Sequence, residues 1–152
     1  MNEVGTPPPV SHNRGALPAP AAQRFFAYRW FLALTLGVFI LDQLTKFLIV
    51  LNLPSNTYGP PHHIPVIAGF FNLVHVGNTG AAWSLFTGRS TVLALLAITT
   101  LTAIFLWRHS LGLRVLTTQI SFGLLCGGIL GNLLDRLVYG HVIDFLDFHF
   151  GS

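Results

Sequence analysis

A stretch of 20 residues from Val115 to Leu134 is largely apolar and contains no Asp, Glu, Lys or Arg. About 20 consecutive apolar residues in a helix suffice to cross the hydrocarbon core of a membrane. Two further stretches are mostly apolar, at residues 30–53, where Asp42 and Lys46 are the charged residues, and at residues 90–107, which carry no charge. Charged residues make up only 9% of the chain. The sequence therefore predicts an integral membrane protein with three transmembrane helices, at about residues 30–53, 90–107 and 115–134.

The other segments differ in composition from these spans. Residues 1–29 contain five prolines among Ala, Gly and Ser, a composition that buries too little apolar surface to fold, so they are predicted to form a disordered cytoplasmic tail. Residues 54–89 are too polar to cross a membrane, but the β-branched and aromatic residues between His63 and Val76 are typical of short strands. We expect an all-α membrane fold with a small extracytoplasmic β-like platform at 54–89, in a domain covering residues 30–148.

Basic residues flank the spans unevenly. Membrane proteins carry more Lys and Arg in the short segments on their cytoplasmic side. Five arginines precede the first span or lie between the second and third: Arg14, Arg24, Arg29, Arg108 and Arg114. This bias predicts a cytoplasmic N-terminus, with the platform and the residues after Leu134 outside, so that Asp135, Asp144 and Asp147 are external.

Two patterns within the spans point to a fixed polar site. Asp42 and Lys46 lie four residues apart, on one helix face, in the second half of the first span. They form an ion pair within the helix, or Asp42 points into a polar cavity, since carboxyl groups at membrane depth usually serve a function. Gly123, Gly127 and Gly131 recur every four residues in the third span, which predicts close approach of another helix.

Three separated motifs accompany these spans. They are Asp42-Gln43-Leu44-Thr45-Lys46, Asn78-Thr79-Gly80-Ala81-Ala82, and Gly131-Asn132-Leu133-Leu134-Asp135-Arg136 continuing through Gly140 and Val142 to Asp144-Phe145. In this order, the chain from about Phe31 to Phe148 resembles the bacterial lipoprotein signal peptidases, or type II signal peptidases. The resemblance implies a four-helix aspartic endopeptidase of the bacterial cytoplasmic (inner) membrane, with both termini in the cytoplasm and its site at the outer face. Such enzymes cleave prolipoprotein signal peptides before a cysteine that carries diacylglycerol.

The resemblance also assigns residues to chemistry. Val142-Ile143-Asp144-Phe145 matches the Val-x-Asp-Phe element of the family, so Asp144 is implied to be catalytic. The second catalytic aspartate of the family belongs to a Phe-Asn-x-Ala-Asp element before the fourth helix, and residues 1–152 contain no such element. Aspartic peptidolysis needs two carboxyl groups in different protonation states. We therefore expect a C-terminally truncated, inactive chain, with residues 149–152 as its cut end.

Neither neighbouring aspartate is a good replacement. Asp147 shares a face with Asp144 only if the segment is helical, and it would then lie beside Asp144 rather than across a scissile bond. Asp135 is instead implied to support the site. By resemblance and chemistry, the substrate-binding or supporting residues are Asp42, Asn78, Gly80, Asn132, Asp135 and Arg136.

These supporting residues suggest specific roles. Asn78 and Asn132 both donate and accept hydrogen bonds, which suits them to holding a substrate backbone. Arg136 anchors a substrate carbonyl or pairs with Asp135, and Asp42 braces the site.

The expected partners are prolipoprotein signal peptides and membrane lipids. No cofactor and no metal are expected, because His62, His63 and His75 lack the geometry of a three- or four-ligand site. Nucleic acid is not an expected partner, because the sequence has no soluble basic patch. The alternative is a small non-enzymatic membrane protein, such as a transporter subunit that uses Asp42 and Asp144 as an ion relay. The acids cluster at one face rather than along a path through the bilayer, which disfavours a relay.

Overall fold

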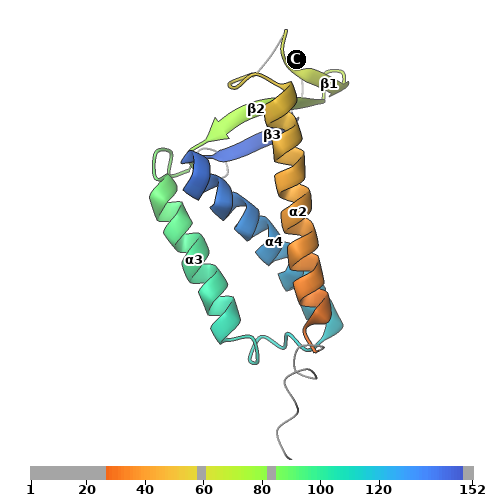
Figure 1. Cartoon of the computed structure of the whole chain (residues 1–152), viewed down its shortest axis with the longest axis vertical. Coiled ribbons are helices and arrows are strands. Elements are labelled where there is room, and N and C mark those ends of the chain that lie inside the picture. Colours follow the sequence, from red (N-terminus) through yellow and green to blue (C-terminus); the bar gives the residue numbers. More distant parts are fainter. Residues whose placement is uncertain (1–26, 58–60, 82–84, 149–152) are drawn as a thin grey trace, which may run out of the picture.

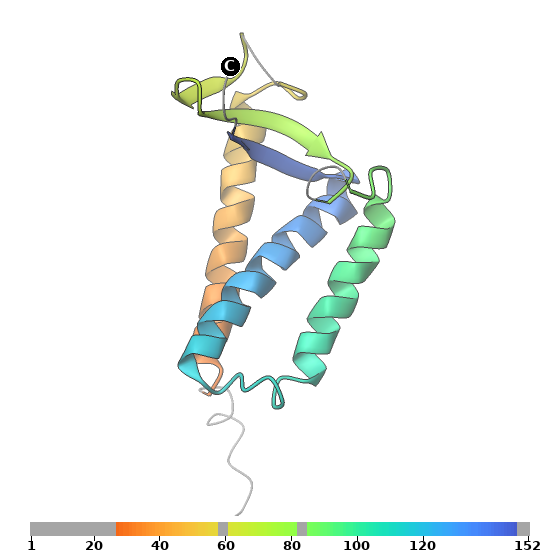
Figure 2. The ribbon, with the colours of Figure 1, turned by 180° about the vertical axis from the view of Figure 1, so that it is seen from behind.

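A computed structural model describes residues 27–57, 61–81 and 85–148, in three helices and three strands (Figures 1 and 2). The helices are α2 (Arg29–Asn52), α3 (Ser90–Leu106) and α4 (Leu116–Tyr139), and the strands are β1 (Ile64–Ile67), β2 (Phe71–Asn78) and β3 (Val142–Phe148). The helices run alongside one another, and the sheet lies across one end of them. Nearly all of the predicted tail, and residues 149–152, lie outside the described residues.

The three predicted spans all form helices, but two of them meet the requirements for crossing a membrane. α2 and α4 each have 24 residues and are apolar enough, whereas α3 is a shorter apolar helix of 17 residues. α4 also continues beyond Leu134 to Tyr139, where Gly140, with a φ of 76°, caps it in the left-handed conformation. Asp135 and Arg136 therefore lie on the helix itself, not behind its end as the sequence suggested.

α2 and α4 pack closely along the glycine stripe. A Cβ added at Gly123 would lie 2.8 Å from Cβ of Leu34, and one at Gly127 would lie 2.6 Å from Cβ of Val38. Real Cβ atoms do not approach other atoms so closely, so only glycine permits this helix separation. The predicted close approach of another helix is confirmed, and that helix is α2.

The sheet makes the fold mixed α/β, which corrects the all-α class expected from the sequence. Its antiparallel strands have the order β1-β2-β3. The predicted strands in the platform are confirmed as β1 and β2, joined by a turn in which Gly69 has a φ of 74°. β3 was not predicted, because its partner β2 lies some 70 residues earlier in the chain; Val142 pairs with Asn78 and Asp144 with Val76.

Different charged residues lie at the two ends of the helices. α2 begins at the end away from the sheet, where the loop between α3 and α4 also lies (Figure 1), so Arg29, Arg108 and Arg114 gather there. The described aspartates lie toward the sheet, on α2, α4 and β3. This separation is what the orientation argument requires, and the placement of either end relative to a membrane stays a prediction.

Candidate active site

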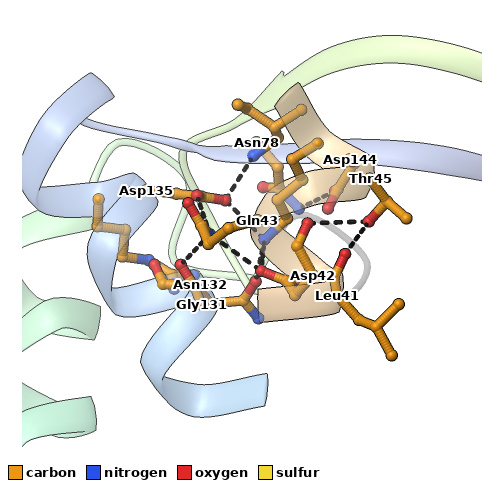
Figure 3. Close-up of polar contacts among 12 residues, drawn as sticks. Leu41, Asp42, Gln43, Thr45, Asn78, Gly131, Asn132, Asp135 and Asp144 are labelled. Carbon is orange, nitrogen blue, oxygen red and sulfur yellow. Dashed lines mark hydrogen bonds and ion pairs between the residues drawn. The ribbon is translucent and has the colours of Figure 1, made fainter. Parts of the chain in front are cut away.

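The centre of the site is Asp135, which lies on α4 and is completely buried beneath β3 (Figure 3). Its Oδ2 lies 2.7 Å from Nζ of Lys46 and accepts the backbone N–H of Ile143 at 3.2 Å. Its Oδ1 accepts Nε2 of Gln43 at 3.0 Å. A buried carboxylate is tolerated only when it is paired and hydrogen-bonded, and Asp135 meets both conditions.

Lys46 is the cation of this site and is almost as deeply buried. Its ammonium has three N–H donors, and it makes three contacts: with Asp135, with Asp42 at 2.9 Å and with Oδ1 of Asn132 at 3.0 Å. Gln43 adds donors to Oδ2 of Asp42 and to the carbonyl of Gly131. We call Asp42, Gln43, Lys46, Asn132 and Asp135 the polar cluster; it ties α2 to α4 at the sheet end.

Asp144 has a different environment. It is exposed, on β3, and its Oδ2 accepts Nδ2 of Asn78 at 2.8 Å. Oδ1 of Asn78 accepts the N–H of Gly80 at 2.8 Å, and Arg136 donates to the carbonyl of Gly80 at 3.0 Å. This chain of contacts connects Asp144 to α4 through the segment that follows β2. Asn78, Gly80 and Arg136 therefore lie together in one site.

A cavity of about 240 Å³ opens between the polar cluster and β3. Asp42, Lys46 and Asn132 line one side, and residues 143–146, with Asp144 among them, line the other. Both readings of Asp42 therefore hold, since it forms the ion pair with Lys46 and also faces a polar cavity. The two carboxyl groups in this space differ, because Asp42 is held by a cation and Asp144 is held by a neutral amide.

The structure separates the remaining predicted residues. Asp147 lies three positions from Asp144 on a strand, so their side chains point to opposite faces, and Asn72 donates to it at 3.5 Å. Arg136 donates to the backbone carbonyls of Asn132 and Gly80, while the described ion-pair partner of Asp135 is Lys46. The contact of Gln43 with Asp135 could not be predicted from the sequence, because those residues are 92 positions apart and on different helices.

Most of the chain matches a known protein family. The family model described as "Signal peptidase (SPase) II" matches residues 34–152. The chain belongs to the signal peptidase II family. It is thus an aspartic peptidase by family and a bacterial membrane enzyme, with two helices that qualify as spans. The match favours the peptidase over the non-enzymatic alternative.

Known members of the signal peptidase II family align over most of the chain. The lipoprotein signal peptidase of Tolumonas auensis is 40% identical over 133 residues, which cover 80% of this chain and 72% of that protein. The lipoprotein signal peptidase of Moorella thermoacetica is 41% identical over 120 residues, 77% and 75% of the two chains. A bacterial membrane enzyme solved by the in meso method at 2.3 Å resolution superposes with a TM-score of 0.67 at 31% identity, covering 78% of this chain and 70% of that one.

Proposed function

We propose that Asp144 supplies one of the two catalytic carboxyl groups of a lipoprotein signal peptidase that cleaves before a diacylglyceryl-modified cysteine. The observation that carries the proposal is the contrast between Asp144 and the other acids near the cavity. Asp144 is exposed and accepts one hydrogen bond, whereas Asp135 is buried and Asp42 and Asp135 share a lysine. A carboxyl group that is to act on water must be reachable and must have an oxygen to spare.

The residues around Asp144 suit peptide hydrolysis. Asn78 holds Oδ2 from the side of β2, which leaves Oδ1 for a water molecule. Asp144 would act as the general base on this water molecule, which would then attack a substrate carbonyl in the cavity. The amide of Asn132 lines the same cavity, although its Oδ1 is occupied by Lys46. Its N–H groups remain suited to a substrate carbonyl.

This mechanism also requires a second carboxyl group. Asp135 is held in the polar cluster, and Asp147 lies on the other face of β3, so neither is suited to pair with Asp144. The Phe-Asn-x-Ala-Asp element of the family has no match in residues 1–152. We infer that a polypeptide of these 152 residues alone does not cleave prolipoprotein, and that one carrying this element after residue 152 does.

A gain-of-function experiment tests both statements. The 152-residue polypeptide is compared with a chimaera in which the aligned C-terminal segment of the Tolumonas auensis enzyme follows residue 152. Each is purified in detergent and incubated with diacylglyceryl-modified prolipoprotein, and cleavage is followed by gel shift. We expect cleavage by the chimaera alone, none of the unlipidated substrate, and none by the chimaera carrying Asp144→Asn. Cleavage that survives Asp144→Asn would refute the role of Asp144, and cleavage by the 152-residue polypeptide would refute the need for a second element.

A further inference from the structure

The Ile143 amide is the point at which the polar cluster contacts the strand that carries Asp144. β3 pairs with β2 along one edge, and β2 has β1 on its other side. The N–H of Ile143 donates to the side chain of Asp135 at 3.2 Å. The residue immediately before the proposed catalytic group is thus fixed by a carboxylate from α4. A backbone fixed at position 143 restricts the direction of the next side chain.

The orientation of Asp135 depends in turn on Lys46. Oδ2 of Asp135 is the atom that accepts from Ile143, and the same atom lies 2.7 Å from Nζ of Lys46. The side chains of Lys46 and Asp135 are only 4% and 1% exposed, so bulk water is a poor substitute for either partner. An unpaired buried carboxylate is strongly disfavoured and would change its charge or its position. Without Lys46, the Asp135 side chain would no longer be held in the position from which it accepts the N–H of Ile143.

We propose that Lys46 is a positioning residue for Asp144, acting through Asp135 and the backbone amide of Ile143. This inference rests on the proposed role of Asp144. It assigns Lys46 more than an ion pair with Asp42 along α2, because the deeper contact is the one with α4. Asp42 is 21% exposed and faces the cavity, so it can be hydrated when Lys46 is removed, whereas Asp135 cannot.

The asymmetry between the two carboxylates gives a test by paired variants. Lys46→Met removes the cation that is paired with Asp42 and with Asp135. Adding Asp135→Asn then relieves the buried carboxylate and keeps a carbonyl oxygen for the N–H of Ile143, whereas adding Asp42→Asn relieves only the hydrated one. Amide hydrogen exchange at Ile143 is measured by mass spectrometry on the 152-residue chain in nanodiscs. Exchange in the middle of α2 reports whether each variant is folded.

We expect Lys46→Met to accelerate exchange at Ile143 roughly ten- to a hundredfold, as loss of a hydrogen bond to a charged group implies. Adding Asp135→Asn should reverse most of this rise, and adding Asp42→Asn should leave it. Unchanged exchange at Ile143 in Lys46→Met would overturn the proposal, and so would equal reversal by both second changes. If Lys46→Met does not fold, Lys46→Gln carries the same comparison, because it lacks the charge but keeps N–H donors.

Turnover adds the functional half of the test. In the chimaera, Lys46→Met should lower kcat about a hundredfold with KM nearly unchanged, since a misplaced catalytic group costs that much. Asp135→Asn in the same background should recover part of kcat. A rise in KM at constant kcat would show that Lys46 serves binding and would overturn positioning. If the chimaera does not cleave at all, the proposed function fails while the exchange experiment still decides the contact with Ile143.

Discussion

Gly131 is the position where one added methyl group should disturb the site most directly. A Cβ at this position would lie 2.7 Å from Cγ of Asp42 and would overlap its Oδ2. Carbon atoms in ordinary contact are about 3.5 Å apart, so the Asp42 side chain must move by about 0.8 Å. That carboxylate is held by Lys46 at 2.9 Å and Gln43 at 3.1 Å. Gly131→Ala therefore displaces part of the polar cluster.

The expected effect on activity exceeds the effect on stability. Overpacking costs about 1–3 kcal/mol, and replacing a glycine by alanine in a helix returns about 1 kcal/mol. The net loss of unfolding free energy should thus be about 0–2 kcal/mol. A displacement near 1 Å in a catalytic constellation costs about a hundredfold in rate, so kcat of the chimaera should fall by about that factor. The assay is single-turnover cleavage of lipidated prolipoprotein, with thermal unfolding in the same detergent.

Two glycines of the same helix supply controls for Gly131→Ala. Gly128→Ala adds its methyl where no atom lies within 4 Å, so activity should not change. Gly127→Ala places its Cβ 2.9 Å from the carbonyl oxygen of Thr35, so it should separate the helices and lower stability. If Gly131→Ala lowers kcat less than threefold, or if Gly128→Ala is equally damaging, the reasoning from Asp42 is refuted.

Three further substitutions test the surrounding contacts. Asn78→Ala removes the donor to Asp144 and should lower kcat roughly ten- to a hundredfold; single-turnover cleavage by the chimaera measures this, and a kcat within twofold of wild type would contradict the contact. Asp147→Asn should leave kcat within about twofold, because its side chain points to the other face of β3 from Asp144; a loss as large as that of Asp144→Asn would show that it takes part. Gln119→Ala removes contacts to Ala27 and Phe31, at 2.9 and 3.3 Å, and should cost about 1–3 kcal/mol in detergent unfolding with kcat preserved; unchanged stability would count against a structural role.

The helices and their closest contact could be predicted because both leave local signals. An uncharged run of sufficient length predicts a span, and Gly123, Gly127 and Gly131 at spacing four predict a close neighbour. The end of α4 could not be predicted from the charge pattern. Asp135 and Arg136 look like the polar residues that follow a span, but Lys46 and the Gly80 carbonyl satisfy them inside the fold, so the helix continues.

Strand β3 and the partners of the polar cluster depend on pairing between distant segments. Val142 to Phe148 forms a strand by pairing with β2, a segment about 70 positions earlier, and seven residues of sequence do not reveal that partner. Lys46 shows the same limit. Its four-residue spacing from Asp42 can be read from the sequence. Its shorter contact, with Asp135, joins residues of two helices that are 86 or more positions apart in the chain.

The polar cluster also explains how several acids can crowd one site while one of them remains available for chemistry. Lys46 gives its three N–H donors to Asp42, Asp135 and Asn132, and Asp135 accepts three hydrogen bonds or ion pairs in return. Low-dielectric surroundings make each unmet charge costly, so such saturation is what allows these groups to be buried. Within the described residues, Asp144 faces the same cavity without a cation in hydrogen-bond contact. The cluster therefore fixes the framework with its own charges satisfied and leaves Asp144 exposed at the cavity, as its proposed catalytic role requires.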